Sequence, residues 1–237
     1  MLIDTSTRTD APEIMDDLSM EGAVLRDTLD QIAKINQLLG GNRITLDGVE
    51  KLLAKMPKSE EITIVDLGCG NGDMLRMMSD YANKNDWDFK LIGIDANPDA
   101  IRYARELSAL YPNITYLAED IFSSHFDTME YDIALCTLTL HHFKEPEVIQ
   151  LLETLKRRAN LGIVINDLHR NALAYRLFQL ISFVFRINDM PKKDGLVSIL
   201  RGFKRSELVG LSKKLNITHY TIKWKWAFRY QWIISKI

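Results

Sequence analysis

The sequence predicts an α/β fold built on a doubly wound, mostly parallel sheet with helices on both faces. From residue 62 onwards, short apolar runs alternate with helical stretches, which is typical of strand–helix–strand crossovers. The length of 237 residues suits one large domain. With 46% hydrophobic and 26% charged residues, the composition is that of a globular protein and excludes a disordered or collagen-like chain.

The N-terminal part of the chain is predicted to be helical over residues 11–56. Its apolar residues recur at helical spacing, and Gly40 and Gly41 would end the first helix. A second, shorter helix is expected over residues 45–55, ahead of Pro57. Because these helices precede the alternating part of the chain, we expect them to form a cap on the sheet.

The alternating part of the chain predicts five strands and the helices between them. The strands are short apolar runs that would be buried, at residues 62–67, 89–95, 114–117, 131–136 and 162–166. The helices between them are expected at residues 71–83, 98–110 and 146–158. The tail differs, because residues 216–223 and 228–235 indicate two strands that pair antiparallel as a hairpin at the sheet edge.

The charge is distributed unevenly along the chain. Residues 1–149 hold 13 Lys and Arg against 27 Asp and Glu, whereas residues 150–237 hold 17 against 5. Such asymmetry can mark an anionic partner at the basic end. We favour the simpler interpretation that opposite halves of one fold, or neighbouring subunits, face each other.

The cysteine content and the length of the apolar runs indicate the cellular compartment in which the protein is expected. The two cysteines, Cys69 and Cys136, cannot form a disulfide framework or a structural zinc site. No run approaches the ~18 consecutive apolar residues of a membrane span, since the longest candidate, residues 177–185, contains polar residues. The N-terminus lacks the pattern of a signal peptide. We therefore expect a cytoplasmic protein without a transmembrane segment.

The residues that directly follow each strand carry the candidate chemistry, because such sheets bind ligands outside the carboxyl ends of their strands. The first strand runs into DLGCGNGD at residues 66–73, whose glycines let the backbone approach a ligand closely. A nicotinamide-binding loop would need glycine at position 73, which is Asp here. Asp95, Glu119 and Asp120 follow the next two strands. So many carboxylates disfavour a phosphate-bearing ligand and favour a cationic one such as S-adenosylmethionine (SAM).

Four segments resemble the successive motifs of the class I SAM-dependent methyltransferases: VDLGCGNG at 65–72, GID at 93–95, AED at 118–120 and YD at 131–132. The specificity of this resemblance comes from order and spacing rather than from the glycine loop alone. It implies a Rossmann-like, seven-stranded methyltransferase fold with SAM as cofactor and S-adenosylhomocysteine (SAH) as product. The resemblance covers roughly residues 60–167, and we expect an N-terminal helical cap over residues 1–57 and a methyltransferase domain over residues 58–237.

The resemblance also implies roles for individual residues. The backbone at Gly68 and Gly70 would face the methionine portion of SAM, with Asp66 near its amino group, and Asp95 would hold the ribose. The adenine edge would meet the residues after the third strand, and the methionine end those of the fourth. The expected cofactor-binding set is Asp66, Gly68, Cys69, Gly70, Asp95, Ala96, Asp120, Ile121 and Cys136.

The loop after the fourth strand, residues 137–143, helps to distinguish nucleic-acid methyltransferases from small-molecule methyltransferases. It lacks the (D/N/S)PP(Y/F/W) signature of amino-methylating nucleic-acid enzymes, and no proline precedes Cys136 to make the pair that attacks a pyrimidine ring. The paired His141 and His142 resemble small-molecule methyltransferases of the ubiquinone and menaquinone type. A narrower resemblance, to bacterial enzymes that methylate phenolic polyketides or phenolic lipids, rests on residues 35–41, 167–170 and 194–198.

Histidine suits methyl transfer to a phenol, because a phenol with a pKa of ~10 needs a base and an imidazole with a pKa of ~6.5 is a suitable one. We expect His141, His142 and Asp167 to be catalytic, with Asp167 orienting one imidazole or binding the substrate. A structural role for the histidines is the alternative. No metal is expected, because Asp132 and Asp167 alone do not make a cluster for a hard cation.

The expected function is methyl transfer to a hydroxyl of a small, largely apolar, phenolic or polyketide-like acceptor. Residues 172–203 begin with an apolar helix over 172–186 and are interpreted as a substrate cover, with ordinary burial as the alternative. Residues 194–203 would be a substrate-contacting loop or a connection. C-methylation of an activated ring and, less favoured, methylation of nucleic acid or protein stay open. No nucleic-acid partner is expected, and a homodimer is left open.

Overall fold

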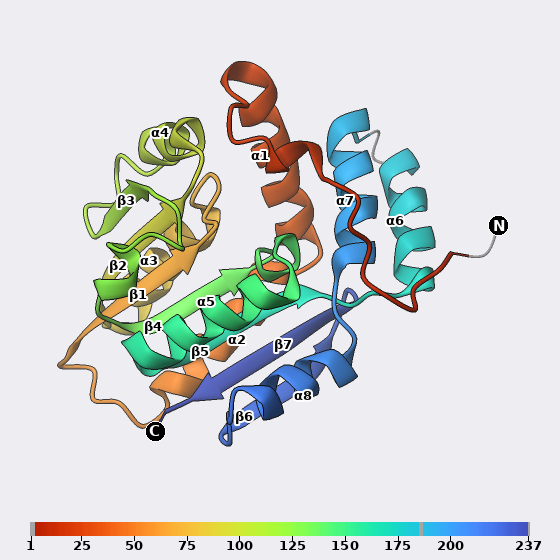
Figure 1. The fold of residues 1–237 in the computed structure, drawn as a ribbon. Helices are drawn as coiled ribbons and strands as arrows, with labels where there is room; N and C mark the ends of the chain where they lie inside the picture. Colours follow the sequence, from red (N-terminus) through yellow and green to blue (C-terminus); the bar gives the residue numbers. More distant parts are fainter. Residues whose placement is uncertain (1–2, 185–186, 237) are drawn as a thin grey trace.

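A seven-stranded sheet with the order β3-β2-β1-β4-β5-β7-β6 forms the centre of the computed structural model, which describes residues 3–184 and 187–236 (Figure 1). The first five strands pair in parallel, β7 pairs antiparallel with β5, and β6 pairs antiparallel with β7. The predicted fold class and the C-terminal hairpin are therefore confirmed. The strands are β1 (Glu61–Leu67), β2 (Asp88–Asp95), β3 (Ile114–Ala118), β4 (Tyr131–Thr137), β5 (Ala159–Leu168), β6 (Tyr220–Lys225) and β7 (Arg229–Ser235).

Helices cover both faces of the sheet and bury one apolar layer against each. One layer is formed by α2 (Gly41–Leu53), α3 (Asp73–Asn85) and α4 (Pro98–Leu107). The other is formed by α5 (Glu145–Arg158) and α8 (Arg205–Lys214). The helices change face once along the chain, because the right-handed crossovers run one way from β1 to β3 and the other way from β4 to β5, so the strand order reverses between β1 and β4. This reversal opens a crevice at the carboxyl ends of the two strands.

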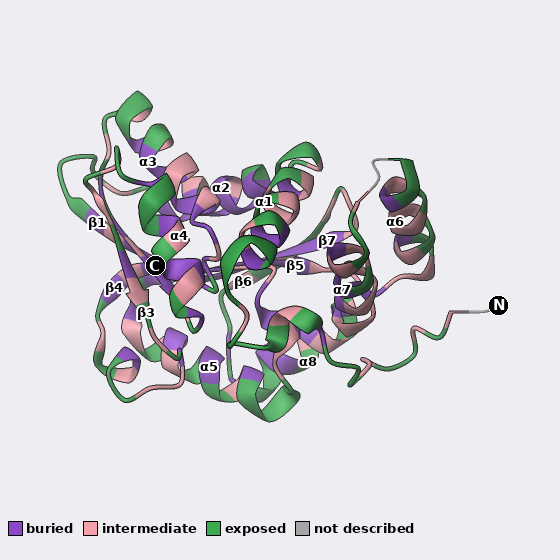
Figure 2. Ribbon diagram, turned by 90° about the horizontal axis from the view of Figure 1, so that it is seen from above, coloured by how far each residue is buried: buried purple, intermediate pink, exposed green. Residues whose placement is uncertain are grey.

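A third group of elements lies beyond the carboxyl ends of the parallel strands (Figure 1). It comprises α1 (Gly22–Leu38), α6 (Ala172–Val184), α7 (Asp189–Arg201) and the N-terminal segment, which runs along α7. Figure 2 shows buried residues gathered along the strands and the inner faces of the helices, while α6 carries mostly intermediate and exposed residues. None of the described helices is long and apolar enough to cross a membrane.

The structure corrects three of the predicted elements. Residues 11–21 contain a single 3-10 turn, Ile14–Asp16, instead of a helix, because the backbone amides of Ile14 and Met15 donate to Asp194 of α7. α2 begins at Gly41 and not at residue 45, directly after a left-handed Gly40. The predicted loop over residues 194–203 is mostly helical and belongs to α7. The end of the predicted helix over 172–186 lies outside the described residues.

The division of the chain at residue 57 stays a prediction. α2 lies within the proposed cap range, yet its apolar face packs on β5 and β7 as part of the core. Gly48 makes this packing possible, because a Cβ there would lie 2.5 Å from Cγ1 of Val164 on β5.

Replacing Gly48 by alanine is expected to destabilise the protein. The gain in helix propensity is up to about 1 kcal/mol, but forcing a methyl group against Val164 costs about 1–3 kcal/mol. Gly210→Ala in α8 is the matched control, because nothing lies within 4 Å of a Cβ there. Denaturant unfolding should show a lower free energy of unfolding for Gly48→Ala and an unchanged or higher one for Gly210→Ala. Equal stability of Gly48→Ala and the parent would contradict the close packing of α2.

Candidate active site

A cavity of about 820 Å³ lies at the carboxyl ends of the parallel strands. Its walls come from the N-terminal segment, the loops after β1 to β4, and helices α1, α6 and α7. Eight of the nine predicted cofactor residues line it: Asp66, Gly68, Cys69, Gly70, Asp95, Ala96, Asp120 and Ile121. Cys136 is the exception and needs correction, because its side chain is fully buried in the core below the cavity. Thr137, Leu138 and Thr139, which follow it, line the cavity in its place.

The glycine loop brings bare backbone to the cavity. Gly68 has a φ of +67°, and a Cβ there would lie 2.7 Å from the side chain of Thr139. Thr139 is held in turn by its hydroxyl, which donates to the carbonyl of Leu67 over 2.8 Å. Gly70 has a φ of +52°, and Leu29 alone would contact a Cβ there. Both positions therefore favour glycine: at Gly68 the missing side chain lets Thr139 pack against the main chain, and at Gly70 it leaves the backbone accessible from the cavity.

Asp66 is a buried carboxylate that needs a cationic partner. It is the penultimate residue of β1, has 2% of its surface exposed, and its Oδ1 has no hydrogen-bond partner among the described residues. Burial, together with the nearby Asp73 and Asp95, raises its pKa well above the usual range of a carboxyl group. A bound ammonium or sulfonium group would relieve this cost, whereas a phosphate would add to it.

Asp95 is held in place by the backbone and keeps free acceptor capacity. Its Oδ2 accepts the amide of Gly70 and its Oδ1 accepts the amide of Asn97, each over 3.0 Å. Burial raises the pKa of Asp95, and these two hydrogen bonds oppose the increase. Because each carboxylate oxygen can accept a second hydrogen bond, Asp95 can bind two hydroxyl groups from the cavity.

The two predicted adenine-edge residues lie where the loop after β3 meets the cavity. The side chain of Asp120 is exposed, and its Oδ1 accepts the amide of Phe122 over 2.9 Å. Ile121 is 8% exposed and packs on the core while still lining the cavity. The loop therefore offers an acidic edge beside an apolar surface, which suits a flat base.

The histidine pair lies at the other side of the cavity, in the 3-10 turn Leu140–His142 after β4. Nδ1 of His141 lies 2.7 Å from Oδ1 of Asp167, and the backbone amide of His141 donates to Oδ2. Burial alone would raise the pKa of Asp167, but His141 outweighs it and the pKa lies below its usual range. Asp167 is not among the residues that line the cavity, so its contact with His141 places it behind the imidazole rather than at the cavity wall.

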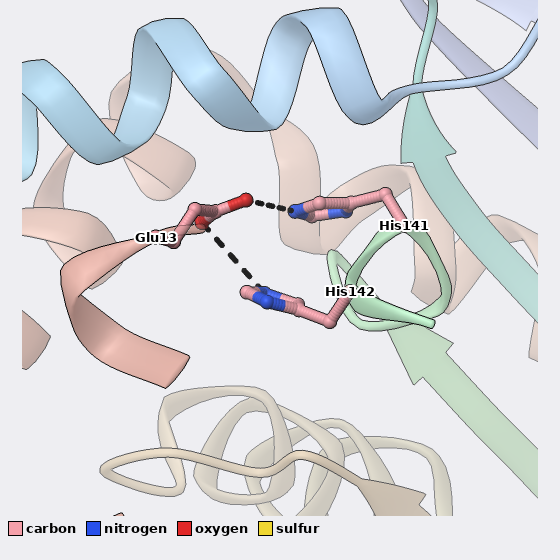
Figure 3. A group of neighbouring side chains, drawn as sticks. All are labelled: Glu13, His141 and His142. Carbon is pink, nitrogen blue, oxygen red and sulfur yellow. Dashed lines mark ion pairs between the residues drawn. The ribbon is translucent and has the colours of Figure 1, made fainter. Parts of the chain in front are cut away.

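The N-terminal segment supplies two site residues that the sequence reasoning missed. Glu13 is 5% exposed, accepts the hydroxyl of Ser198 over 2.7 Å and faces both imidazoles (Figure 3). Asp16 pairs with Nδ1 of His142 at 2.8 Å and with Arg201 at 2.9 Å. Burial would lower the pKa of His142, but Asp16 and Glu13 outweigh burial and raise it.

Arg229 is a third residue that was missed. It begins β7, is 4% exposed and lines the cavity, and within the described part of the chain no carboxylate forms an ion pair with it. Its Nη1 is buried and lacks a hydrogen-bond partner there. Burial lowers its pKa to about 10, against the opposing effect of Asp167. The guanidinium is therefore charged at neutral pH and available to an oxyanion in the cavity.

Replacing Asp66 by asparagine is expected to stabilise the free protein and to weaken binding of a cationic cofactor. The folded protein holds the proton of Asp66 more tightly than the unfolded chain, so stability falls as pH rises from about 4 towards the folded pKa. The uncharged asparagine side chain avoids this loss, so the free energy of unfolding at neutral pH is expected to rise by about 0.5–2 kcal/mol. Losing a hydrogen bond from an ammonium group should weaken SAM about 10- to 100-fold.

Thermal unfolding and calorimetric titration with SAM check both halves of this prediction. Asp88→Asn, at the exposed start of β2, is the control. In the parent protein, SAM binding should release a proton from Asp66 and tighten as pH rises through its pKa. Unchanged SAM affinity in Asp66→Asn would show that this carboxylate does not meet the cofactor.

Comparison with known proteins agrees with this geometry. A family model described as a methyltransferase domain matches residues 64–162, which include the glycine loop and β2 to β4. The class of domain that the motifs resemble is thereby confirmed. Ribosomal RNA large subunit methyltransferase G of Shewanella denitrificans is 26% identical over 155 residues, covering 62% of this chain and 39% of that protein. The chain spans less than half the length of the curated relatives it matches.

Two solved structures show the same fold. The plantazolicin methyltransferase BpumL in complex with SAH superposes with a TM-score of 0.64 at 20% identity, covering 88% of this chain and 89% of that one. The CurJ carbon methyltransferase gives a TM-score of 0.61 at 15% identity, covering 81% of this chain and 53% of that one. At such identities the likeness establishes the fold alone.

Proposed function

We propose that this chain, which carries a class I SAM-dependent methyltransferase domain, transfers a methyl group from SAM to a hydroxyl of a small, largely apolar acceptor. One observation carries the proposal. A single cavity joins the carboxylate-lined glycine loop to an oriented histidine and to apolar helix faces. Cofactor binding, proton removal and acceptor binding can therefore take place in one continuous cavity.

The cofactor end of the cavity fits SAM by its donor and acceptor groups. Asp66 would accept the ammonium group, Asp95 would accept the two ribose hydroxyls, and the loop at Asp120 would border the adenine. Bound SAM supplies the methyl group and a sulfur atom that keeps the electron pair of the broken carbon–sulfur bond. Only the proton of the acceptor then needs a destination in the protein.

His141 is the proposed destination of that proton. Because Asp167 accepts hydrogen bonds only, it holds a proton on Nδ1 and leaves the lone pair of Nε2 free. This Nε2 is buried at the cavity and has no hydrogen-bond partner in the described ranges. A hydroxyl placed there would lose its proton to Nε2 as its oxygen bonds to the methyl carbon. The rest of the rate enhancement would come from holding SAM and the acceptor close together in the cavity.

The acceptor half of the cavity supports an apolar molecule with an ionisable group. α1 and α6 contribute apolar side chains to the wall, namely Leu25, Leu29, Ile32, Leu177, Phe178 and Ile181. Together with the N-terminal segment and α7 they keep water from the reacting atoms, so residues 172–203 are proposed as the substrate cover. Arg229 supplies a positive charge that suits a phenolate, enolate or carboxylate.

The test is methyl transfer by the purified full-length chain with isotope-labelled SAM. The panel contains phenols, phenolic acids and quinols on one side, and RNA and protein extracts on the other. We expect label in the phenolic compounds, and nuclear magnetic resonance of the product identifies the methylated atom. Transfer to a ring carbon would replace the hydroxyl assignment, and transfer only to RNA or protein would overturn the proposed acceptor class.

A substitution at Arg229 tests the expected ionisable group of the acceptor. Arg229→Met keeps much of the side-chain volume and removes the charge, so KM for phenolic acids should rise about 10-fold or more, the value of one hydrogen bond to a charged group. The Kd of SAM should stay the same. An unchanged KM would show that Arg229 does not meet the acceptor.

A further inference from the structure

We propose that Glu13, His141 and His142 bind one divalent transition-metal ion at the acceptor side of the cavity. One nitrogen from each imidazole and one oxygen of the carboxylate lie within 4.8 Å of one another, and Figure 3 shows the three side chains converging from the N-terminal segment and the loop after β4. Glu13 and His141 are buried and His142 is partly buried, so this is not a chance gathering of surface groups.

The hydrogen bonds behind the two imidazoles set their free nitrogens towards the same point. Nδ1 of His141 bonds Asp167 at 2.7 Å, and Nδ1 of His142 bonds Asp16 at 2.8 Å. A carboxylate only accepts, so each Nδ1 carries a proton, and a metal ion would take the place of any proton on Nε2. Histidines that bind metals in proteins almost always donate their other ring N–H to a carboxylate, a carbonyl or water.

The gap between the three groups has the size and polarity of a cation site. Nε2 of His141 lies 3.8 Å from Oε1 of Glu13, and Nε2 of His142 lies 4.0 Å from Oε2. These separations are too long for direct hydrogen bonds, and Nε2 of His141 is buried without a partner in the described part of the chain. Arg201, whose Nη1 lies 3.3 Å from Oε1 of Glu13, offsets part of the carboxylate's charge, and a cation between the three groups would bind the electron pairs that face one another there. Bonds of ~2.0–2.2 Å to zinc would draw the three groups together by about 1 Å or less each.

The ligand set indicates the class of ion. Two imidazole nitrogens and one carboxylate oxygen suit Zn²⁺, Co²⁺ or Fe²⁺, whereas Mg²⁺ and Ca²⁺ prefer oxygen ligands. Three protein ligands leave a coordination position for a molecule in the cavity, as catalytic zinc sites do. This site departs from the metal-free expectation, which considered Asp132 and Asp167 but had no means to place Glu13 beside the histidines.

The identity of the fourth ligand rests on the proposed function, but metal binding itself does not. If the acceptor is a phenol or enol, its oxygen would occupy the open position as the oxyanion, its proton having passed to solvent, and the ion would supply Lewis-acid chemistry that lowers the acceptor's pKa there. Nε2 of His141 would then be a metal ligand, whereas in the metal-free protein it is the proton acceptor. In the metal-bound and in the metal-free protein, the acceptor oxygen would lie at the same place, beside Glu13, His141 and His142.

The test is a calorimetric titration of tag-free, chelator-treated, full-length protein with Zn²⁺, without SAM or acceptor. We expect saturation at one equivalent per chain and a rise in Tm, because the ion joins the N-terminal segment to the loop after β4. Co²⁺ should give the visible absorption of a low-coordinate site. Glu13→Gln and His142→Ala should abolish saturable binding, and Asp16→Asn should weaken it about 10- to 100-fold.

His125→Ala is the matched control, since His125 also pairs with a carboxylate, Glu119, but on the surface. It should bind Zn²⁺ like the parent. Variants that unfold are recognised by their circular dichroism, and Glu13→Gln is nearly isosteric and should retain the fold. No saturable binding in the parent, or equal binding in folded Glu13→Gln and His142→Ala, would overturn the metal site. Neither result depends on methyl transfer, so the site and the proposed function fail separately.

Discussion

Replacing His141 by glutamine is expected to lower kcat by roughly 10²–10⁴, the usual contribution of a positioned base. Glutamine is close to histidine in size and places an amide near the position of Nε2, but this amide cannot take the acceptor's proton. The Kd of SAM should hardly change, because Asp66 and Asp95 lie at the other side of the cavity. Single-turnover kinetics with a phenolic acceptor and calorimetry with SAM measure the two quantities separately.

The pH dependence of His141→Gln distinguishes lost chemistry from a distorted site. The deficit in kcat should shrink as pH rises towards the acceptor's own pKa, ~10 for a phenol, since a phenolate formed in solution needs no base. A merely distorted variant would stay slow at every pH. Asp167→Asn should show a partial form of the same defect, because it weakens the orientation of the ring. Full activity of His141→Gln at neutral pH would leave the histidine with a structural role only.

The parallel core could be predicted from the sequence because its signals are local. Each of the first five strands is an apolar run bounded by polar residues, and amphipathic helices follow β1, β2 and β4, so these elements and their order follow from periodicity. The glycine loop and Asp95 could be placed for the same reason, since both directly follow a strand. The error at Cys136 has a local cause as well. Alternation along β4 directs its thiol into the core, and the cavity begins one residue later.

The acceptor side could not be predicted because it is assembled from distant segments. Glu13 and Asp16 meet His141 and His142 only because the N-terminal segment crosses α7, where Asp194 holds the amides of Ile14 and Met15. Both acids lie in a stretch that the sequence predicts as helical, and an acidic residue on a helix carries no signal of that contact. Arg229 gave no signal either, since an arginine at the start of an edge hairpin is ordinarily solvated and only the fold shows that this one is buried.

Asp95→Ala is expected to make the binding free energy of SAM about 2–4 kcal/mol less favourable, a loss of roughly 30- to 1000-fold in affinity. Two hydrogen bonds from ribose hydroxyls to a carboxylate would be lost together, and such charge-assisted bonds are stronger than neutral ones. The carboxylate also holds the amides of Gly70 and Asn97, so its removal loosens the glycine loop. Asp99→Ala is the control, since Asp99 lies nearby in the first turn of α4 but is not among the residues that line the cavity.

A cofactor analogue separates the two contributions of Asp95. SAH lacking a ribose hydroxyl should bind the parent protein more weakly than SAH does, because one acceptor position of Asp95 is left unfilled. In Asp95→Ala the two compounds should bind almost equally. The ratio of their Kd values is therefore measured in the parent and in the variant, and the change in this ratio gives the coupling energy between the carboxylate and the hydroxyl. If Asp95→Ala weakens both compounds by the same factor, the loss comes from the loosened glycine loop, and the ribose is bound elsewhere. Unchanged SAH affinity in a folded Asp95→Ala protein would remove Asp95 from the cofactor site altogether.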